Sequence, residues 1–414
     1  MGVGRSRAIR IAIVGAENLL SRLPEALHGP GVEIVLVAPA GSYLLASDFV
    51  TERLELSALD PKEDWFGTVV RNSQLIADLN ADYYLLGSDA LALAIASSSL
   101  PTAVKLRLLP LHQERALGMV GSKVGFARAM HDSKTSGPFT MIAESAEELG
   151  ELLRDTPLPL VVKGDTGAGG AAVEIIHTLP FTAPDDWFPV VVQEFAPGIE
   201  TGVEALFVNG HLAGWLYSRV IASVIPKGPS GARRFITPPA LDFVETLESI
   251  GRYAGLHGMF NASLMWNPAT KTHALFELDV RPNTWFQFAR TLGVDWSALM
   301  AGACESTSPA HPTVRSAGRV IRLYPHEIVG AIRYGNVGKL LRWCGLGRGT
   351  YRSRNHRDRA VNRYERRLIR LALKDRVARW LIAVERNLPT PIAKAFSRSG
   401  ITSVLNRMMS RPKS

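Results

Sequence analysis

The chain has 414 residues, of which 46% are hydrophobic and 21% are charged. This length predicts two or three domains, and the apolar content excludes a wholly disordered protein. The apolar runs are shorter than the roughly 18 residues of a membrane-spanning helix, and the opening one is too short for an export signal. Two cysteines are too few for a disulfide framework or a metal cluster, so we expect a reducing cytoplasm.

Charge is unevenly distributed along the chain. Residues 311–414 hold 24 Lys and Arg against 5 Asp and Glu, whereas the other 310 residues hold 23 basic and 33 acidic side chains. A basic segment on a mildly acidic body indicates an acidic partner for that segment. The partner class stays open at this point between an anionic membrane, a nucleic acid and an acidic protein face.

Residues 1–118 have the pattern of an N-terminal, doubly wound, parallel α/β domain. Ile- and Val-rich runs at 9–16 and 32–40 predict strands, with a helix at about 19–27 between them. A helix, a strand ending near Leu86 and a helix behind Ser88 follow. The turn after the first strand lacks the G-x-G-x-x-G spacing, so the pattern does not favour a nicotinamide dinucleotide.

Residues 119–310 predict an α+β core. Hairpins are expected through Asn209-Gly210 and through Asn267-Pro268. Helices are predicted at 120–130, 145–155 and 241–256. Two strands flank a glycine loop within 158–176, and a further strand lies within 190–200 and ends in a turn.

Residues 311–414 form a basic C-terminal extension that is expected to be mostly helical. Apolar side chains at helical spacing between Ala360 and Glu385, with arginines on the other face, predict a basic amphipathic helix. This helix could pack its apolar stripe on the body, or it could dock on an anionic membrane or a lipid-like substrate. A nucleic acid is disfavoured because no reader motif accompanies the charge.

Lys163 and the glycines after it are the strongest local signal of chemistry. The lysine closes a predicted strand, and Gly164, Gly167, Gly169 and Gly170 follow. Backbone N–H groups of such a loop can reach phosphate oxygens, and the lysine adds a positive charge. The lysine precedes the glycines, so this is not a Walker loop. An ordinary glycine turn beside an exposed lysine is the alternative.

Two further strands carry polar side chains in suggestive positions. In the segment 193–200, Gln193 is a polar residue at the end of a strand, and Glu200 follows seven positions later. These two side chains could bind the base edge and the ribose of a nucleotide. Glu277, Asp279 and Arg281 share one face of a strand because strand side chains alternate. Two carboxylates at this spacing suit Mg²⁺ shared with nucleotide phosphates. A solvated face with an ion pair is the alternative for either strand.

Taken together, these motifs resemble the ATP-grasp superfamily of carboxylate-amine ligases over about 122–291. The resemblance implies a two-lobed nucleotide-clamping core that binds ATP and Mg²⁺, with Mn²⁺ as a possible substitute. It implies a small-molecule carboxylate and a small-molecule amine as substrates, and a homodimer is common among relatives.

The resemblance also implies roles for individual residues. Lys123, Lys163, Gly167, Gly169 and Gly170 would hold the nucleotide phosphates. The strand end at Gln193, Glu194, Phe195 and Ala196 would bind adenine, and Glu200 the ribose. Glu277 and Asp279 would hold the metal, and Arg281 would lie near the reacting carboxyl group.

Cations at Arg219 and Arg233 fall where the family keeps a mobile substrate loop, so we expect them near the chemistry. One departure concerns the strand before Glu277. Relatives place another acid there, whereas this chain has Asn261 and Ser263. An ATP-grasp ligase is the function that this sequence predicts, localised in the cytoplasm or peripherally on a membrane. The alternatives are a nucleotide-binding protein without turnover and a kinase on the same fold.

Overall fold

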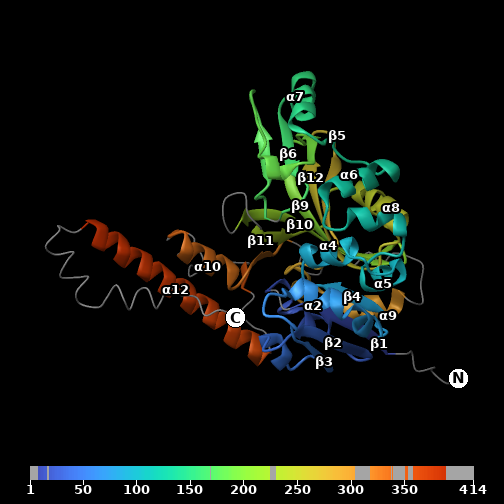
Figure 1. Cartoon of the computed structure of the whole chain (residues 1–414), viewed down its shortest axis with the longest axis vertical. Coiled ribbons are helices and arrows are strands. Elements are labelled where there is room, and N and C mark those ends of the chain that lie inside the picture. Colours follow the sequence, from blue (N-terminus) through green and yellow to red (C-terminus); the bar gives the residue numbers. More distant parts are fainter. Residues whose placement is uncertain are drawn as a thin grey trace.

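The protein contains three β-sheets arranged along its long axis, with one long helix projecting from the side (Figure 1). The computed structural model describes residues 8–15, 18–167, 169–223, 230–303, 318–336, 338, 350–352 and 358–387.

The first sheet is entirely parallel and belongs to the N-terminal domain. Its strands have the order β3-β2-β1-β4 and are β1 (Ile9–Val14), β2 (Val32–Pro39), β3 (Glu52–Leu56) and β4 (Tyr83–Leu86). The helices are α1 (Leu23–Leu27), α2 (Trp65–Arg71), α3 (Ser73–Ala77), α4 (Asp89–Ser97) and α5 (Thr102–Leu108). Alternate residues of β1 enter two different apolar clusters, because both faces of the sheet are covered. The predicted parallel α/β fold of this domain is confirmed.

The second sheet is small and antiparallel, with the order β5-β8-β6-β7. Its strands are β5 (Thr140–Ala143), β6 (Leu160–Gly164), β7 (Val173–Ile176) and β8 (Val190–Glu194). Helix α7 (Ala146–Asp155) packs on it through Leu149 and Leu153 and begins at Ser145, whose hydroxyl accepts a hydrogen bond from the Glu148 N–H. Helix α6 (Lys123–Asp132) leads from the N-terminal domain into this sheet.

The third sheet has seven strands in the order β13-β12-β9-β10-β11-β14-β15. They are β9 (Ile199–Val208), β10 (His211–Ser223), β11 (Ser230–Phe235), β12 (Gly258–Asn267), β13 (Thr272–Asp279), β14 (Val320–Arg322) and β15 (Thr350–Arg352). Helix α8 (Asp242–Ala254) covers one face, and α9 (Trp296–Ala303) follows β13. The expected turn at Asn209-Gly210 is confirmed, with φ values of 50° and 87°.

Two expectations about boundaries differ from the structure. Residues 219 and 233 lie on paired strands β10 and β11 rather than on a loop, and both strands contain runs of consecutive buried residues. Lys227 and the rest of 224–229 lie outside the described residues. The sheet also continues past 310 through β14 and β15, so its edge does not coincide with the predicted domain boundary.

The C-terminal extension is fastened to the N-terminal domain by one end of a long helix. Helix α12 (Arg359–Asn387) starts against the N-terminal domain, passes α10 (His326–Arg333) and then runs away from the body (Figure 1). Buried Glu365 pairs with Arg22 at 2.5 Å, and the Tyr364 ring stacks on Tyr43 at 3.7 Å. This helix covers the stretch for which the sequence predicts one, and the inner face of its first turns packs on the body. None of the described helices combines the length and apolarity needed to cross a membrane.

Candidate active site

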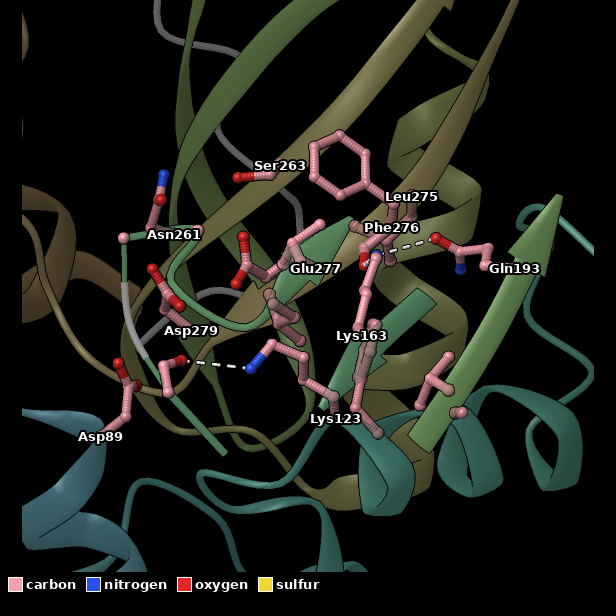
Figure 2. Close-up of a pocket in the computed structure, with 18 of the residues that line it drawn as sticks. Asp89, Lys123, Lys163, Gln193, Asn261, Ser263, Leu275, Phe276, Glu277 and Asp279 are labelled. Carbon is pink, nitrogen blue, oxygen red and sulfur yellow. Dashed lines mark hydrogen bonds between the residues drawn. The ribbon is translucent and has the colours of Figure 1, made fainter. Parts of the chain in front are cut away.

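A cavity of about 920 Å³ opens between the small antiparallel sheet and the seven-stranded sheet. Strands β6 and β8 form one wall, β12 and β13 form the opposite wall, and Asp89 at the start of α4 lies at one end (Figure 2). Most of the residues singled out from the sequence lie on this lining. These are Lys123, Lys163, Gly167, Gly169, Gly170, Gln193, Glu200, Arg233, Glu277, Asp279 and Arg281.

Lys163 stands in the middle of the cavity wall. Its Nζ donates to Gln193 Oε1 at 2.8 Å and to the Phe276 carbonyl at 3.2 Å (Figure 2). Burial lowers the pKa of Lys163 to about 8, and Lys123 acts in the same direction against Glu277. Two acceptors thus fix the ammonium group where a phosphate can approach it.

Lys123 is held against the glycine loop by the start of α6. Ser122 caps this helix, and its hydroxyl donates to Asp165 Oδ1 at 2.6 Å. The Lys123 Nζ donates to the Gly167 carbonyl at 3.1 Å. Gly167 has a φ of 118°, a conformation that favours glycine. The loop therefore brings flexible backbone and a second cation to the same end of the cavity as Lys163.

The carboxylates of Glu277 and Asp279 line the opposite wall. They pair across the sheet with Ser263 and Asn261 of β12 (Figure 2). Burial, together with the nearby carboxylates of Asp89 and Glu277, raises the pKa of Asp279 to about 8 against the opposing charge of Arg281. The site therefore crowds negative charge at one point.

Arg281 is held between that wall and the N-terminal domain. Its Nε donates to Asp89 Oδ2 at 2.7 Å, and its Nη2 lies 3.4 Å from Asp279 Oδ2. Asp89 follows β4, and Ser88 caps the helix it begins. The position of this arginine thus depends on both domains.

A buried ion pair supports the end of the cavity behind Asn261. Glu204 of β9 is fully buried and accepts from Arg233 Nη1 at 2.7 Å. The same carboxylate oxygen, Oε1, accepts from Asn261 at 3.3 Å and from Asn283 at 3.4 Å. Arg233 also lies over the Trp285 ring at 5.0 Å. This network fixes three cavity-lining side chains around one carboxylate.

Four of the predicted site residues do not line the cavity. Arg219 is exposed on β10 beside Arg234, away from the lining. Glu194, Phe195 and Ala196 also lie outside it, since the backbone of 194 and 195 already bonds the carbonyls of Phe139 and Pro159. Gln193 does line it, but its side chain is bonded to Lys163 and Thr140.

Sequence reasoning missed four residues of this region. Asp89 carried a weak signal, because it follows the carboxyl end of a parallel strand, where ligand sites gather. Glu204 and Asn283 carried none, since nothing local distinguishes a buried polar partner from a surface one. His326, which lies in the C-terminal extension, also lines the cavity. Its role depends on a contact between distant segments.

The carboxylate wall fits a divalent cation shared with a bound phosphate. Glu277 and Asp279 supply hard oxygen ligands, and a cation bound there would offset the burial and the neighbouring carboxylates that raise the pKa of Asp279. Within the described residues, no group of three or more His, Cys, Asp or Glu side chains could enclose a metal alone. A magnesium ion here would take further ligands from phosphate and water.

Solved structures of low sequence identity share this architecture. N5-carboxyaminoimidazole synthetase from Staphylococcus aureus complexed with ADP matches with a TM-score of 0.52 and 12% identity over 74% of this chain and 79% of that chain. Phosphoribosylamine–glycine ligase from Thermotoga maritima matches with a TM-score of 0.51 and 17% identity over 73% and 78%.

The biotin carboxylase domain of 2-oxoglutarate carboxylase from Hydrogenobacter thermophilus, in complex with MgADP and bicarbonate, matches with a TM-score of 0.52 and 13% identity over 72% and 71%. No family model matches the sequence, and no curated protein matches it. These likenesses establish the fold: the chain has the ATP-grasp fold.

Proposed function

We propose that the protein is an ATP-dependent ligase that activates a carboxylate as an acyl phosphate and joins it to an amine. The observation that carries this proposal is the placement of Lys163 opposite Glu277 and Asp279 in one cavity. Cations and metal-binding carboxylates facing each other suit the transfer of a phosphoryl group. The similar structures that hold ADP, and in one case its magnesium complex, support a nucleotide at this place.

Each part of the site has a task in this reaction. Lys123 and Lys163 would hold the ATP phosphates, and Mg²⁺ at Glu277 and Asp279 would offset charge on them. A carboxylate oxygen of the first substrate attacks the terminal phosphorus, and the bond to ADP breaks. Arg281 stabilises the charge on the transferring group. The amine then attacks the acyl carbon, the C–N bond forms, and phosphate leaves with the electron pair.

The test is ADP release by the purified protein with ATP and Mg²⁺ across amino acids and other carboxylates, singly and in pairs. We expect release that depends on one pair. Glu277→Gln should abolish it, whereas Glu147→Gln, an exposed acid on α7, should leave it unchanged. Equal ADP release with every carboxylate, or equal release in the Glu277 variant, would contradict the proposal.

A second candidate is a nucleotide-binding protein without turnover. The observation that favours it is the neutral pair beside the metal carboxylates on the same wall, where Ser263 and Asn261 supply no carboxylate. Glu204 does not replace the acid that relatives place on this strand, because its side chain is fully buried and paired with Arg233. Saturable ATP binding without ADP from any pair would support this candidate. A phosphorylated product that never joins a second substrate would instead indicate a kinase.

We also propose that the outer face of α12 docks on an anionic membrane. Six exposed cations share this face along about 23 Å of helix; they are Arg359, Arg363, Arg366, Arg367, Arg370 and Lys374. Leu373 and Val377 lie among them with 48% and 49% of their surfaces exposed. Apolar side chains between cations suit a lipid headgroup region, into which they can insert.

Vesicle sedimentation tests this docking. We expect binding to vesicles containing phosphatidylglycerol and not to phosphatidylcholine alone. Each cation near such a surface contributes about 1 kcal/mol, so replacing Arg363, Arg366, Arg367 and Arg370 with Gln should weaken binding on the order of 10³-fold.

The matched control replaces four exposed cations of the globular part with Gln: Lys62, Arg128, Arg252 and Lys271. This control should bind the vesicles like the wild type. Equal losses in the two variants, or tighter binding to a DNA duplex than to the anionic vesicle at the same salt, would contradict membrane docking.

A further inference from the structure

His326 brings the C-terminal extension into the cavity. It is the first residue of α10, and its side chain is on the same lining as Lys163, Glu277 and Asp279. Its Nδ1 is shut off from solvent and has no hydrogen-bond partner among the described residues. Nε2 is therefore the ring nitrogen that a substrate can reach.

The wall around His326 continues along β11 to Arg233. The Leu323 N–H bonds the Gly231 carbonyl at 2.9 Å, which fixes this segment beside β11. The neighbouring Ser230 hydroxyl accepts from Arg233 at 2.8 Å and from Trp285 at 3.1 Å. Ser230, Arg233 and Trp285 line the same cavity as His326, and Arg233 is one of the charges that act on Asp279. The strand β8 with Gln193 is on the other side of the cavity.

The surroundings of His326 favour the neutral imidazole. Burial lowers its pKa below the usual value, Glu365 opposes this effect and Arg22 adds to it. Glu365 and Arg22 are the charged groups that face the ring, and they form an ion pair with each other. The positive end of α10 also disfavours an added proton. At neutral pH the ring therefore keeps a free lone pair.

Several other titratable groups of the cavity already have partners or tasks. Asp89 is bonded to Arg281, and Lys163 is bonded to Gln193. Glu277 and Asp279 would be committed to the metal. The amine, by contrast, needs a group that can take a proton as it attacks.

We propose that His326 is the general base that receives the proton of the attacking amine, an inference that rests on the proposed ligase activity. The amine enters as an ammonium ion and loses one proton to solvent. Its lone pair attacks the acyl carbon, and the acyl–oxygen bond to phosphate breaks. The second proton passes from the new C–N nitrogen to His326 Nε2 and then to solvent.

Hydroxylamine separates this step from the earlier ones. It is uncharged at neutral pH and captures acyl phosphates without a base, so hydroxamate formation reports activation alone. We expect His326→Ala to form hydroxamate at the wild-type rate while amide formation falls about 10²- to 10⁴-fold, as for loss of a general base. Added imidazole should restore part of the amide rate. His326→Gln, which keeps the side-chain volume, should also form hydroxamate at the wild-type rate and lose amide formation, but added imidazole should not restore its amide rate.

The pH profile gives a second readout. Wild-type amide formation should fall as the pH drops through the pKa of His326, and the variants should lose this limb. His211→Ala, an exposed histidine of β10, should behave like the wild type. Equal loss of amide and hydroxamate, or no loss of either, would overturn the role of His326. Wild-type protein that makes neither product would instead refute the ligase proposal.

Discussion

Removal of Arg233 should destabilise the protein far more than removal of a surface arginine. Glu204 is fully buried, and Arg233 is the cation paired with it at 2.7 Å. Arg233→Met leaves this carboxylate without its counter-charge, which costs about 3–5 kcal/mol of unfolding free energy for a buried pair. Arg128→Met is the matched control, because Arg128 and Glu144 are 60% and 55% exposed. That change should cost no more than about 1 kcal/mol.

A double substitution isolates the charge. Burial raises the pKa of Glu204 even beside Arg233, so an unpaired carboxylate there should protonate readily. Glu204→Gln combined with Arg233→Met keeps an oxygen acceptor for Asn261 and Asn283 and removes both charges. We expect it to recover most of the lost stability, to within about 1–2 kcal/mol of the wild type.

Urea unfolding followed by tryptophan fluorescence suits this measurement, since Trp285 lies under Arg233. The loss in Arg233→Met should shrink as the pH falls, because protonated Glu204 no longer carries a charge. The reasoning is refuted if Arg233→Met costs no more than Arg128→Met, or if the double variant shows the sum of the two single losses.

Three further outcomes follow from contacts in the cavity. The pKa of Lys163 near 8 predicts that ATP affinity falls above pH 8, because this ammonium group loses its proton. The fall should be at most about tenfold per pH unit. In a binding titration, Lys163→Arg should remove this pH dependence. Asp89→Asn weakens the hydrogen bond that positions Arg281, so it should lower kcat about tenfold without changing the KM for ATP. A change in the KM for ATP alone would contradict this role of Asp89. A Cβ on Gly125 would lie 1.7 Å from the Gly118 carbonyl, so Gly125→Ala should lower stability by about 1–3 kcal/mol in thermal unfolding. Gly118→Ala, whose Cβ meets no atom within 4 Å, should not.

The parts of the site that the sequence predicted are those whose signal is local. Lys163 and its glycines occupy consecutive positions, and Glu277 and Asp279 share a face because strand side chains alternate. The hydrophobic runs also predicted the parallel sheet and both hairpins, since buried strands require apolar residues.

The parts that the sequence did not predict depend on contacts between distant segments. Asp89 and Arg281 are 192 positions apart, and His326 reaches the cavity because β14 pairs with β11. The segment predicted to bind adenine lies outside the cavity lining after Gln193, because the N–H groups of Glu194 and Phe195 bond the carbonyls of neighbouring segments. Residues 219 and 233 looked like a loop because glycine and proline dominate the stretch between them. The strand ends on either side of this stretch have no sequence feature of similar strength that would indicate a strand.

The central claim is that the protein activates a carboxylate by phosphorylating it. With the substrate pair that supports ADP release, the carboxylate can be labelled with ¹⁸O and the phosphate product analysed by mass spectrometry. A carboxylate oxygen that attacks the terminal phosphorus stays with the phosphate when the amine displaces it. We predict one ¹⁸O atom in each inorganic phosphate formed. Unlabelled phosphate released together with ADP would contradict the account.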